Sequence, residues 1–116
     1  MRIQLKRAYE PPGKEDGVRL LVERLWPRGL TKEKAGIDEW FKDVAPSAKL
    51  RTWYSHDLKK WPEFRRRYQE ELRANREEIA RLRERIKTGA ATFVYAAKDE
   101  EHNSALVLKE YLEGKA

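Results

Sequence analysis

Runs of apolar residues predict three strands. Apolar and polar residues largely alternate along residues 3–9, which is typical of a strand with one buried face. Residues 18–22 form a second apolar run directly after the turn pair Asp16-Gly17. Residues 91–97 carry no charge and are rich in strand-forming side chains, so they predict a central strand that is buried on both faces.

A fourth segment, residues 37–44, fits two periodicities. Its apolar residues have helical spacing, but the alternate positions from Trp40 to Val44 also fit one face of a strand. Gly36 and Pro46 leave room for barely two helical turns between them. We therefore favour a strand in this segment.

Capping residues and glycines predict three shorter helices. The first begins at the N-cap Thr31 and ends at Gly36. The second begins at the N-cap Ser47 and closes at residues 55–57. A last helix is expected over residues 104–113, directly after a polar loop that follows the central strand.

The segment from about 60 to 88 predicts one long charged helix. Apolar residues recur there at spacings of three, four and seven, which form a narrow stripe along one helical face. The other faces carry ten basic and six acidic side chains, so most of the net charge of +6 lies on this helix. Such a face is usually a solvated lattice of ion pairs. It could also follow a nucleic-acid backbone, and the stripe leaves a homodimer possible.

Strands separated by helices predict one α/β domain over residues 1–116, with a mostly parallel sheet of about four strands flanked by helices. Ligands of open parallel sheets bind beyond the carboxyl ends of the strands. We therefore expect residues 24–29, 45–47 and 98–103 to lie on one rim. An antiparallel second or third strand would separate these loops.

The composition limits the partners and the catalytic chemistry that we expect for this chain. The net charge of +6 favours an anionic partner without naming it. The absence of cysteine excludes thiolate catalysis, disulfides and Cys-ligated zinc. No apolar span approaches the roughly 18 residues of a membrane helix, and the N-terminal residues contain no signal-peptide core. We therefore expect a cytoplasmic protein without membrane contact.

The loop at residues 24–29 is the leading candidate for a binding site. Arg24, Trp26 and Arg28 lie around Pro27, which stiffens the backbone just beyond a buried strand. Arginine suits bidentate contact with phosphate or carboxylate. In the structural alternative, Arg24 pairs with an acid such as Glu23 while Trp26 covers the core.

Further candidates lie on the other two loops of the rim. Lys98, His102 and Asn103 precede a helix N-terminus, where free N–H groups favour anions. Ser47 is a candidate ligand-binding residue of this rim, and its position is more typical of a helix cap than of a nucleophile. Arg51, one helical turn later, could face the same rim. The two histidines, at positions 56 and 102, are the candidate proton carriers. They lack metal-ligand spacing, and no glycine-rich phosphate motif is present, so neither a metal nor a cofactor is predicted.

Three segments of the chain resemble a known family, the YeaO-like proteins, catalogued as domain of unknown function 488. The segments are residues 24–29 (RLWPRG), 45–57 (APSAKLRTWYSHD) and 97–103 (AKDEEHN). The resemblance implies a small α/β domain and no established activity. The chain departs from the family pattern at Glu23, where the family usually has Asp. Longer relatives carry a cysteine in the loop corresponding to residues 98–103, and this chain has none.

The sequence therefore predicts a domain that binds a small anionic ligand, bearing phosphate or carboxylate, at the shared rim. The alternative from a different class is a non-catalytic module that binds nucleic acid through the helix at 60–88. Whether any bond is made or broken stays open, and so does the choice between monomer and homodimer.

Overall fold

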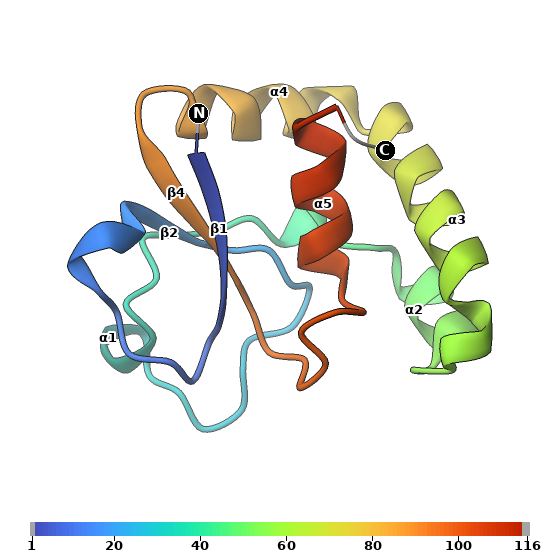
Figure 1. The fold of residues 1–116 in the computed structure, drawn as a ribbon, viewed down its shortest axis with the longest axis horizontal. Helices are drawn as coiled ribbons and strands as arrows, with labels where there is room; N and C mark the ends of the chain where they lie inside the picture. The colour runs from blue at the N-terminus through green and yellow to red at the C-terminus, as the bar shows by residue number, and fades with distance from the viewer. Residues whose placement is uncertain (1, 115–116) are drawn as a thin grey trace.

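The structure is a computed structural model and describes residues 2–114 (Figure 1). The described residues form four strands and five α-helices, and helices separate β2 from β3 and β3 from β4, as the sequence predicts for an α/β domain. The strands are β1 (Arg2–Arg7), β2 (Val18–Leu21), β3 (Glu39–Trp40) and β4 (Ala90–Tyr95). The helices are α1 (Lys32–Ala35), α2 (Ala48–Tyr54), α3 (Trp61–Ala74), α4 (Arg76–Ile86) and α5 (Ser104–Leu112).

All strand pairs of the sheet are parallel, and the strand order is β1-β4-β2-β3. The uncharged strand β4 lies in the interior of the sheet, as predicted. Phe93 at its middle is paired with Leu5 of β1 on one side and with Leu20 of β2 on the other. The predicted parallel sheet of about four strands is confirmed.

The two faces of the sheet differ in what covers them. On one face, Leu20 and Phe93 lie fully buried in the main core beneath helices α2 to α5. On the opposite face, Leu21 and Val94 pack in a smaller cluster with Ala35 of α1. Because burying a large apolar side chain contributes about 1.5–3 kcal/mol, the main core supplies most of the driving force for folding.

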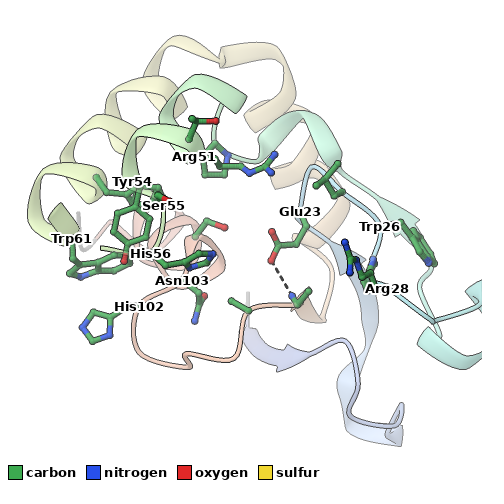
Figure 2. A pocket seen from close by; sticks show the side chains of 18 of the residues that line it. Glu23, Trp26, Arg28, Arg51, Tyr54, Ser55, His56, Trp61, His102 and Asn103 are labelled. Atoms are coloured by element: carbon green, nitrogen blue, oxygen red, sulfur yellow. Dashed lines mark hydrogen bonds between the residues drawn. The ribbon is translucent and has the colours of Figure 1, made fainter. Parts of the chain in front are cut away.

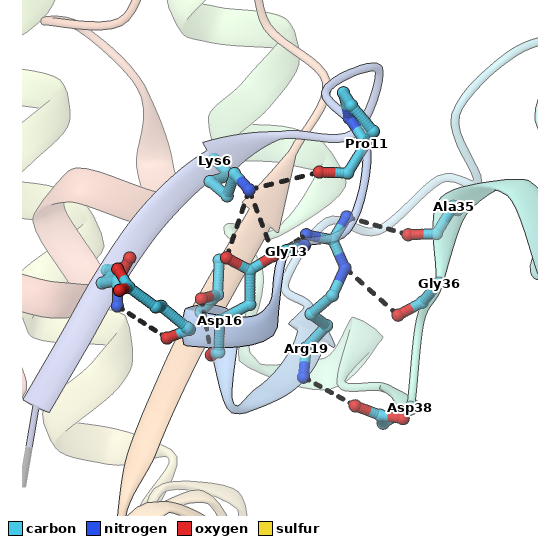
Figure 3. Close-up of polar contacts among 11 residues, drawn as sticks. Lys6, Pro11, Gly13, Asp16, Arg19, Ala35, Gly36 and Asp38 are labelled. Atoms are coloured by element: carbon cyan, nitrogen blue, oxygen red, sulfur yellow. Dashed lines mark hydrogen bonds and ion pairs between the residues drawn. The ribbon is translucent and has the colours of Figure 1, made fainter.

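The second face also contains a buried polar cluster, which we call the Asp16–Arg19 cluster (Figure 3). The Arg19 guanidinium donates to Asp16 at 2.6 Å and to the carbonyl oxygens of Ala35 and Gly36 at 2.8 and 3.1 Å. Lys6 donates to the same carboxylate at 3.1 Å. Both charged residues that name the cluster are 3% exposed. The cluster fixes the turn before β2 to the segment that follows α1.

The prediction of one helix over residues 60–88 is wrong, because the helix breaks at Asn75. The backbone there leaves the helical region (ψ 57°), and the Asn75 side-chain amide donates to the Asp43 carbonyl oxygen at 2.7 Å. Asparagine favours such local bonding over the helix interior. Figure 1 shows α4 crossing the top of the view and α3 descending from its end. Leu72 and Ile79 are seven residues apart, so the apolar spacing continues through the bend and conceals it.

The apolar stripe of α3 and α4 packs against the main core. Tyr68, Leu72, Leu82 and Ile86 are all buried in the main core. The Tyr68 hydroxyl donates to the Val44 carbonyl oxygen at 2.6 Å, which ties α3 to the loop before α2. The stripe therefore provides no free surface for the predicted alternative of a dimer through this helix.

Residues 37–44 form a strand over only two residues. Glu39 and Trp40 pair with β2, and a 3-10 turn over Lys42–Val44 follows. Phe41 and Val44 turn into the core and are fully buried. A strand is therefore present, as predicted, but it is shorter than the predicted segment. The 3-10 turn ends it and lets both Phe41 and Val44 enter the main core.

The topology creates a crevice at the carboxyl ends of β2 and β4. Strand β2 continues into α1, which packs on one face of the sheet, whereas β4 continues into α5, which packs on the other face. Neighbouring parallel strands whose connections leave to opposite faces form a switch point, where ligands of α/β sheets bind.

Candidate functional site

A pocket of about 560 Å³ lies at this crevice (Figure 2). Three segments provide most of its lining: the loop after β2, the helix α2 with its following turn, and the loop after β4. The lining residues that carry polar or aromatic groups are Tyr9, Glu23, Trp26, Arg28, Arg51, Thr52, Tyr54, Ser55, His56, Trp61, Phe64, His102, Asn103 and Ser104. The parallel sheet thus brings parts of the three predicted loops together.

Glu23 lies at the centre of the pocket in Figure 2. Its Oε1 atom accepts a hydrogen bond from the Ala96 backbone N–H at 3.0 Å, which links the end of β2 to the end of β4. Burial raises the pKa of this carboxyl; the Ala96 N–H and the charges of Arg51 and His56 oppose the shift without cancelling it. Ionisable groups with such shifts cluster at functional sites.

From the sequence alone, Glu23 is expected only as a partner for Arg24 and as a departure from the family pattern. A usable signal was present, because Glu23 is the first charged residue after a buried strand that lies next to the central strand. At that position the side chain must lie at the carboxyl edge of the sheet.

The three predicted arginines have different environments. Arg24 does not line the pocket; its guanidinium donates to the carbonyl oxygens of Pro46 and Ala45 at 3.2 and 3.4 Å. Arg28 and Arg51 do line the pocket. Among residues 2–114, neither of these two guanidiniums donates a hydrogen bond or forms an ion pair to another side chain. Arg24 therefore ties two loops together, whereas the other two face the pocket with donors available.

Trp26 lines the pocket and is also anchored within the fold. Its indole N–H donates to the Leu30 carbonyl oxygen at 2.7 Å, and its ring packs edge-on against Trp40 with centroids 5.5 Å apart. The Tyr9 hydroxyl donates to the Arg28 carbonyl oxygen at 3.0 Å. These bonds hold the loop after β2 in place and support the position of Arg28 at the pocket.

The opposite wall of the pocket is aromatic. Tyr54 and Phe64 are stacked with ring centroids 4.4 Å apart, and Trp61 packs against Phe64 at 5.6 Å. The His102 ring stands edge-on to Trp61 at 5.2 Å. Both Tyr54 and Phe64 are buried in the core, whereas Trp61 and His102 are partly exposed. The wall thus consists of two buried rings, Tyr54 and Phe64, and two rings that solvent can reach, Trp61 and His102.

His56 lines the pocket and has an unfavourable backbone conformation. Helix α2 ends at Ser55 with φ 45°, and His56 follows with φ 59°. Left-handed conformations cost about 1–2 kcal/mol for residues other than glycine. Such strain persists only where the surrounding structure imposes it, and it is frequent at functional sites.

Asp99 organises the loop after β4. Its carboxylate accepts hydrogen bonds from the backbone N–H groups of Glu101 and His102 at 2.9 and 3.0 Å, and lies 3.0 Å from His102 Nδ1. These bonds, the Glu101 N–H first, lower the Asp99 pKa. The Asn103 side chain caps α5 by accepting from the Leu106 N–H at 2.9 Å. His102 and Asn103 therefore reach the pocket on a stabilised turn.

Besides Arg24, two predicted site residues lie outside the main pocket. Lys98 is exposed and lines an adjoining depression of about 470 Å³, which shares Tyr54, His56 and His102 with the main pocket. Ser47 caps α2, accepting from the Leu50 N–H at 3.1 Å, and its hydroxyl donates to Glu71 at 2.7 Å. The predicted capping role of Ser47 is confirmed.

Within residues 2–114, no three side chains of His, Cys, Asp or Glu are arranged to hold a metal ion. Over the same residues, none of the helices is both long and apolar enough to cross a membrane.

Comparisons with known proteins place the chain in a family. It matches the family described as "Inactive DUF488-N3 subclade" over residues 2–116. It is 41% identical over 112 residues to the uncharacterized protein YeaO of Escherichia coli, covering 97% of both chains. It is 40% identical over 114 residues to the uncharacterized protein Rv3073c of Mycobacterium tuberculosis, covering 98% of this chain and 96% of that protein. No solved structure matches it significantly. The chain belongs to the DUF488 family, in the subclade described as inactive.

Proposed function

We propose that the protein binds a small anionic ligand, bearing phosphate or carboxylate, in the pocket at the carboxyl ends of β2 and β4. The observation that carries the proposal is the pair of arginines, Arg28 and Arg51, which line the pocket without a hydrogen-bond acceptor among the described residues. An arginine in a pocket offers a planar set of donors that matches both anions. Arg24 and Ser47 are used within the fold and are not part of the proposed contacts.

The start of α5 supports the same ligand class. Ser104 lines the pocket at the first residue of α5, and the first turn of this helix contains no acidic residue. Helix N-termini present free N–H groups and a partial positive charge. Asn103 occupies only the Leu106 N–H. An anion held by the arginines would gain from this second source of positive potential.

Binding without a chemical step is the simpler form of the proposal. The pocket contains titratable groups but no cysteine, and no three groups of a metal site lie among the described residues. The family description as an inactive subclade favours the same choice.

The proposal is tested by thermal unfolding of the wild-type protein and of Arg51→Gln in phosphate, sulfate and chloride at constant ionic strength. A ligand that binds only the folded state raises Tm, and a concentration 100-fold above Kd stabilises by about 2.7 kcal/mol. We expect phosphate or sulfate to raise Tm for the wild type and not for Arg51→Gln. Arg73→Gln is the matched control, because Arg73 is an exposed arginine of α3 outside the pocket. Equal shifts in all three proteins would contradict the proposal.

Nucleic-acid binding by the arginine-rich helices has weaker support. Arg66 pairs with Glu63 and Glu70, while Arg81 and Arg85 both pair with Glu39. Arg67 lies over the Trp53 ring, 4.3 Å from its centroid, and pairs with Glu63. These side chains form the ion-pair lattice that the sequence pattern favours. A Tm increase with oligonucleotides, equal in wild type and Arg51→Gln and reduced by salt, would favour this alternative.

A further inference from the structure

We infer that the ligand of the pocket is a phosphate monoester that also carries a hydrogen-bond donor, such as a hydroxyl or amino group, and a flat ring. A mononucleotide has this combination of groups. The inference rests on the proposed anion-binding function and specifies its ligand class. It comes from three features of the pocket that an isolated phosphate or sulfate ion would leave unused.

The first feature is Glu23, the only acidic residue lining the main pocket among the described residues. Its carboxyl points into the space between the pocket walls (Figure 2). Oε1 accepts from the Ala96 N–H, and no described residue donates a hydrogen bond to Oε2. A carboxylate repels an anion, so a ligand that fills the pocket must offset this repulsion with a donor group facing Glu23.

The second feature is the aromatic wall. Figure 2 shows Trp26 and Arg28 on one side of Glu23, and Tyr54, Trp61 and His102 on the other. The partly exposed Trp61 and His102 present an aromatic surface on that side. Flat rings of a ligand gain affinity by packing against aromatic side chains. A phosphate beside Arg28 and a ring beside Trp61 would place the middle of the ligand at Glu23.

The third feature is size. The pocket volume of about 560 Å³ falls within the range of sites for organic ligands, roughly 300–1,000 Å³. Inorganic phosphate would fill only a small part of this volume. The ligand that complements the whole pocket therefore extends from Arg28 across Glu23 to the aromatic wall (Figure 2).

Isothermal titration calorimetry with a graded set of ligands tests the inference. The set is inorganic phosphate, ribose 5-phosphate, AMP and adenosine, titrated into the wild-type protein at one pH and ionic strength. We expect affinity to rise from inorganic phosphate to ribose 5-phosphate, as hydroxyl groups are added, and again to AMP, as the ring is added. Adenosine, which lacks the phosphate, should bind at least ten-fold more weakly than AMP, because charged hydrogen bonds are the stronger ones.

Glu23→Gln tests the donor group separately. We expect this variant to bind ribose 5-phosphate and AMP about ten-fold more weakly, because a hydrogen bond to a charged acceptor is lost. Its affinity for inorganic phosphate should be unchanged or higher, because a repulsive charge is removed. Glu101→Gln is the matched control, since Glu101 is an exposed acid of the loop after β4 and does not line the pocket.

The outcomes separate this inference from the proposed function. If inorganic phosphate binds and AMP binds no tighter, the anion site stands and the extended ligand class is wrong. If Glu23→Gln binds ribose 5-phosphate as tightly as the wild type, the donor assignment to Glu23 is wrong. If neither phosphate nor AMP binds the wild type, the proposed function itself fails. The wild-type series needs no variant, so it decides the ligand class even where Glu23→Gln does not fold.

Discussion

Two carboxyl groups of this domain, those of Asp16 and Glu23, are shielded from water but have different hydrogen-bond partners. On one face of the sheet, Asp16 accepts hydrogen bonds from Lys6, from Arg19 and from the Gly13 backbone N–H. At the carboxyl edge of the sheet, Glu23 accepts one hydrogen bond, from the Ala96 N–H. Both lie near an arginine. Arg19 uses its guanidinium on three acceptors, whereas Arg51 donates to none of the described residues.

The pKa values record this difference. Burial alone would raise the pKa of Asp16, but the Gly13 N–H, Lys6 and Arg19 outweigh it and leave the pKa below its ordinary value. Burial also raises the pKa of Glu23, and there the opposing contacts are too few to reverse it. A buried ionisable group that is fully paired serves the fold. One that is left partly unpaired in a pocket is available to a ligand.

The largest effect that tests this comparison is expected for Arg19→Met. Removing the guanidinium leaves the Asp16 carboxylate buried with Lys6 and one backbone N–H as partners, and breaking a buried pair costs about 3–5 kcal/mol. Urea unfolding followed by circular dichroism measures the loss. Arg51→Met is the matched variant and should cost about 1 kcal/mol or less, since its guanidinium makes no bond that the fold needs. Equal losses in both variants would show that the two arginines have the same structural role.

The fold was largely predictable because local signals and tertiary packing agree. The uncharged run at 91–97 can be buried on both faces, and it became the interior strand β4. Thr31 and Ser47 cap helices where the sequence places them, with their side chains accepting from the N–H groups of Lys34 and Leu50. The break at Asn75 was hidden, because it depends on a bond to Asp43, far along the chain, and not on local periodicity.

The loops that form the site were predictable from the sequence, but the contacts of their side chains were not. Parallel strands fix which loops meet, so Trp26, Arg28, Arg51 and His102 were all expected near one rim. Sequence cannot show which guanidinium finds an acceptor inside the fold. Arg24 finds two backbone carbonyl oxygens, and Arg28, four residues later, finds none among the described residues. The burial of Glu23 cannot be predicted from the sequence either, because it depends on walls contributed by α2 and by the loop after β4.

A smaller effect is expected for Glu23→Gln, and its dependence on pH sharpens the comparison of the two carboxyls. The pKa of Glu23 is raised in the folded protein, so the folded state holds the proton more tightly than the unfolded state does. The favourable contribution of Glu23 is therefore complete below its ordinary pKa of 4.5 and is lost as pH rises through the raised value. Glutamine does not titrate. Relative to the wild type, Glu23→Gln should gain stability between pH 4 and pH 7, by about 1 kcal/mol or less.

Urea unfolding at pH 3, 4, 5, 6 and 7 gives the difference in free energy of unfolding between each variant and the wild type, and the range extends below the ordinary pKa of Asp16, 3.8. Asp16→Asn provides the opposite case, because the Asp16 pKa is lowered. The stability that Asp16 contributes is present above its ordinary pKa and is lost as pH falls through the lowered value, so the cost of Asp16→Asn should shrink on acidification. If the two differences change with pH in the same direction, the assignment of one carboxyl to the fold and the other to the pocket is wrong.

The smallest effect on stability is expected for Arg28→Met. Arg28 is exposed, and its guanidinium has no acceptor among the described residues, so the change should leave the free energy of unfolding within about 0.5 kcal/mol of the wild-type value. The same variant should nevertheless lose much of the Tm increase caused by phosphate, because half of the proposed anion contacts are gone. Arg19→Met cannot give this combination, because it should lower the free energy of unfolding by about 3–5 kcal/mol. If Arg28→Met instead loses stability and keeps the phosphate response, Arg28 has a structural role like that of Arg19. Arg51 would then be the remaining arginine proposed to bind the anion.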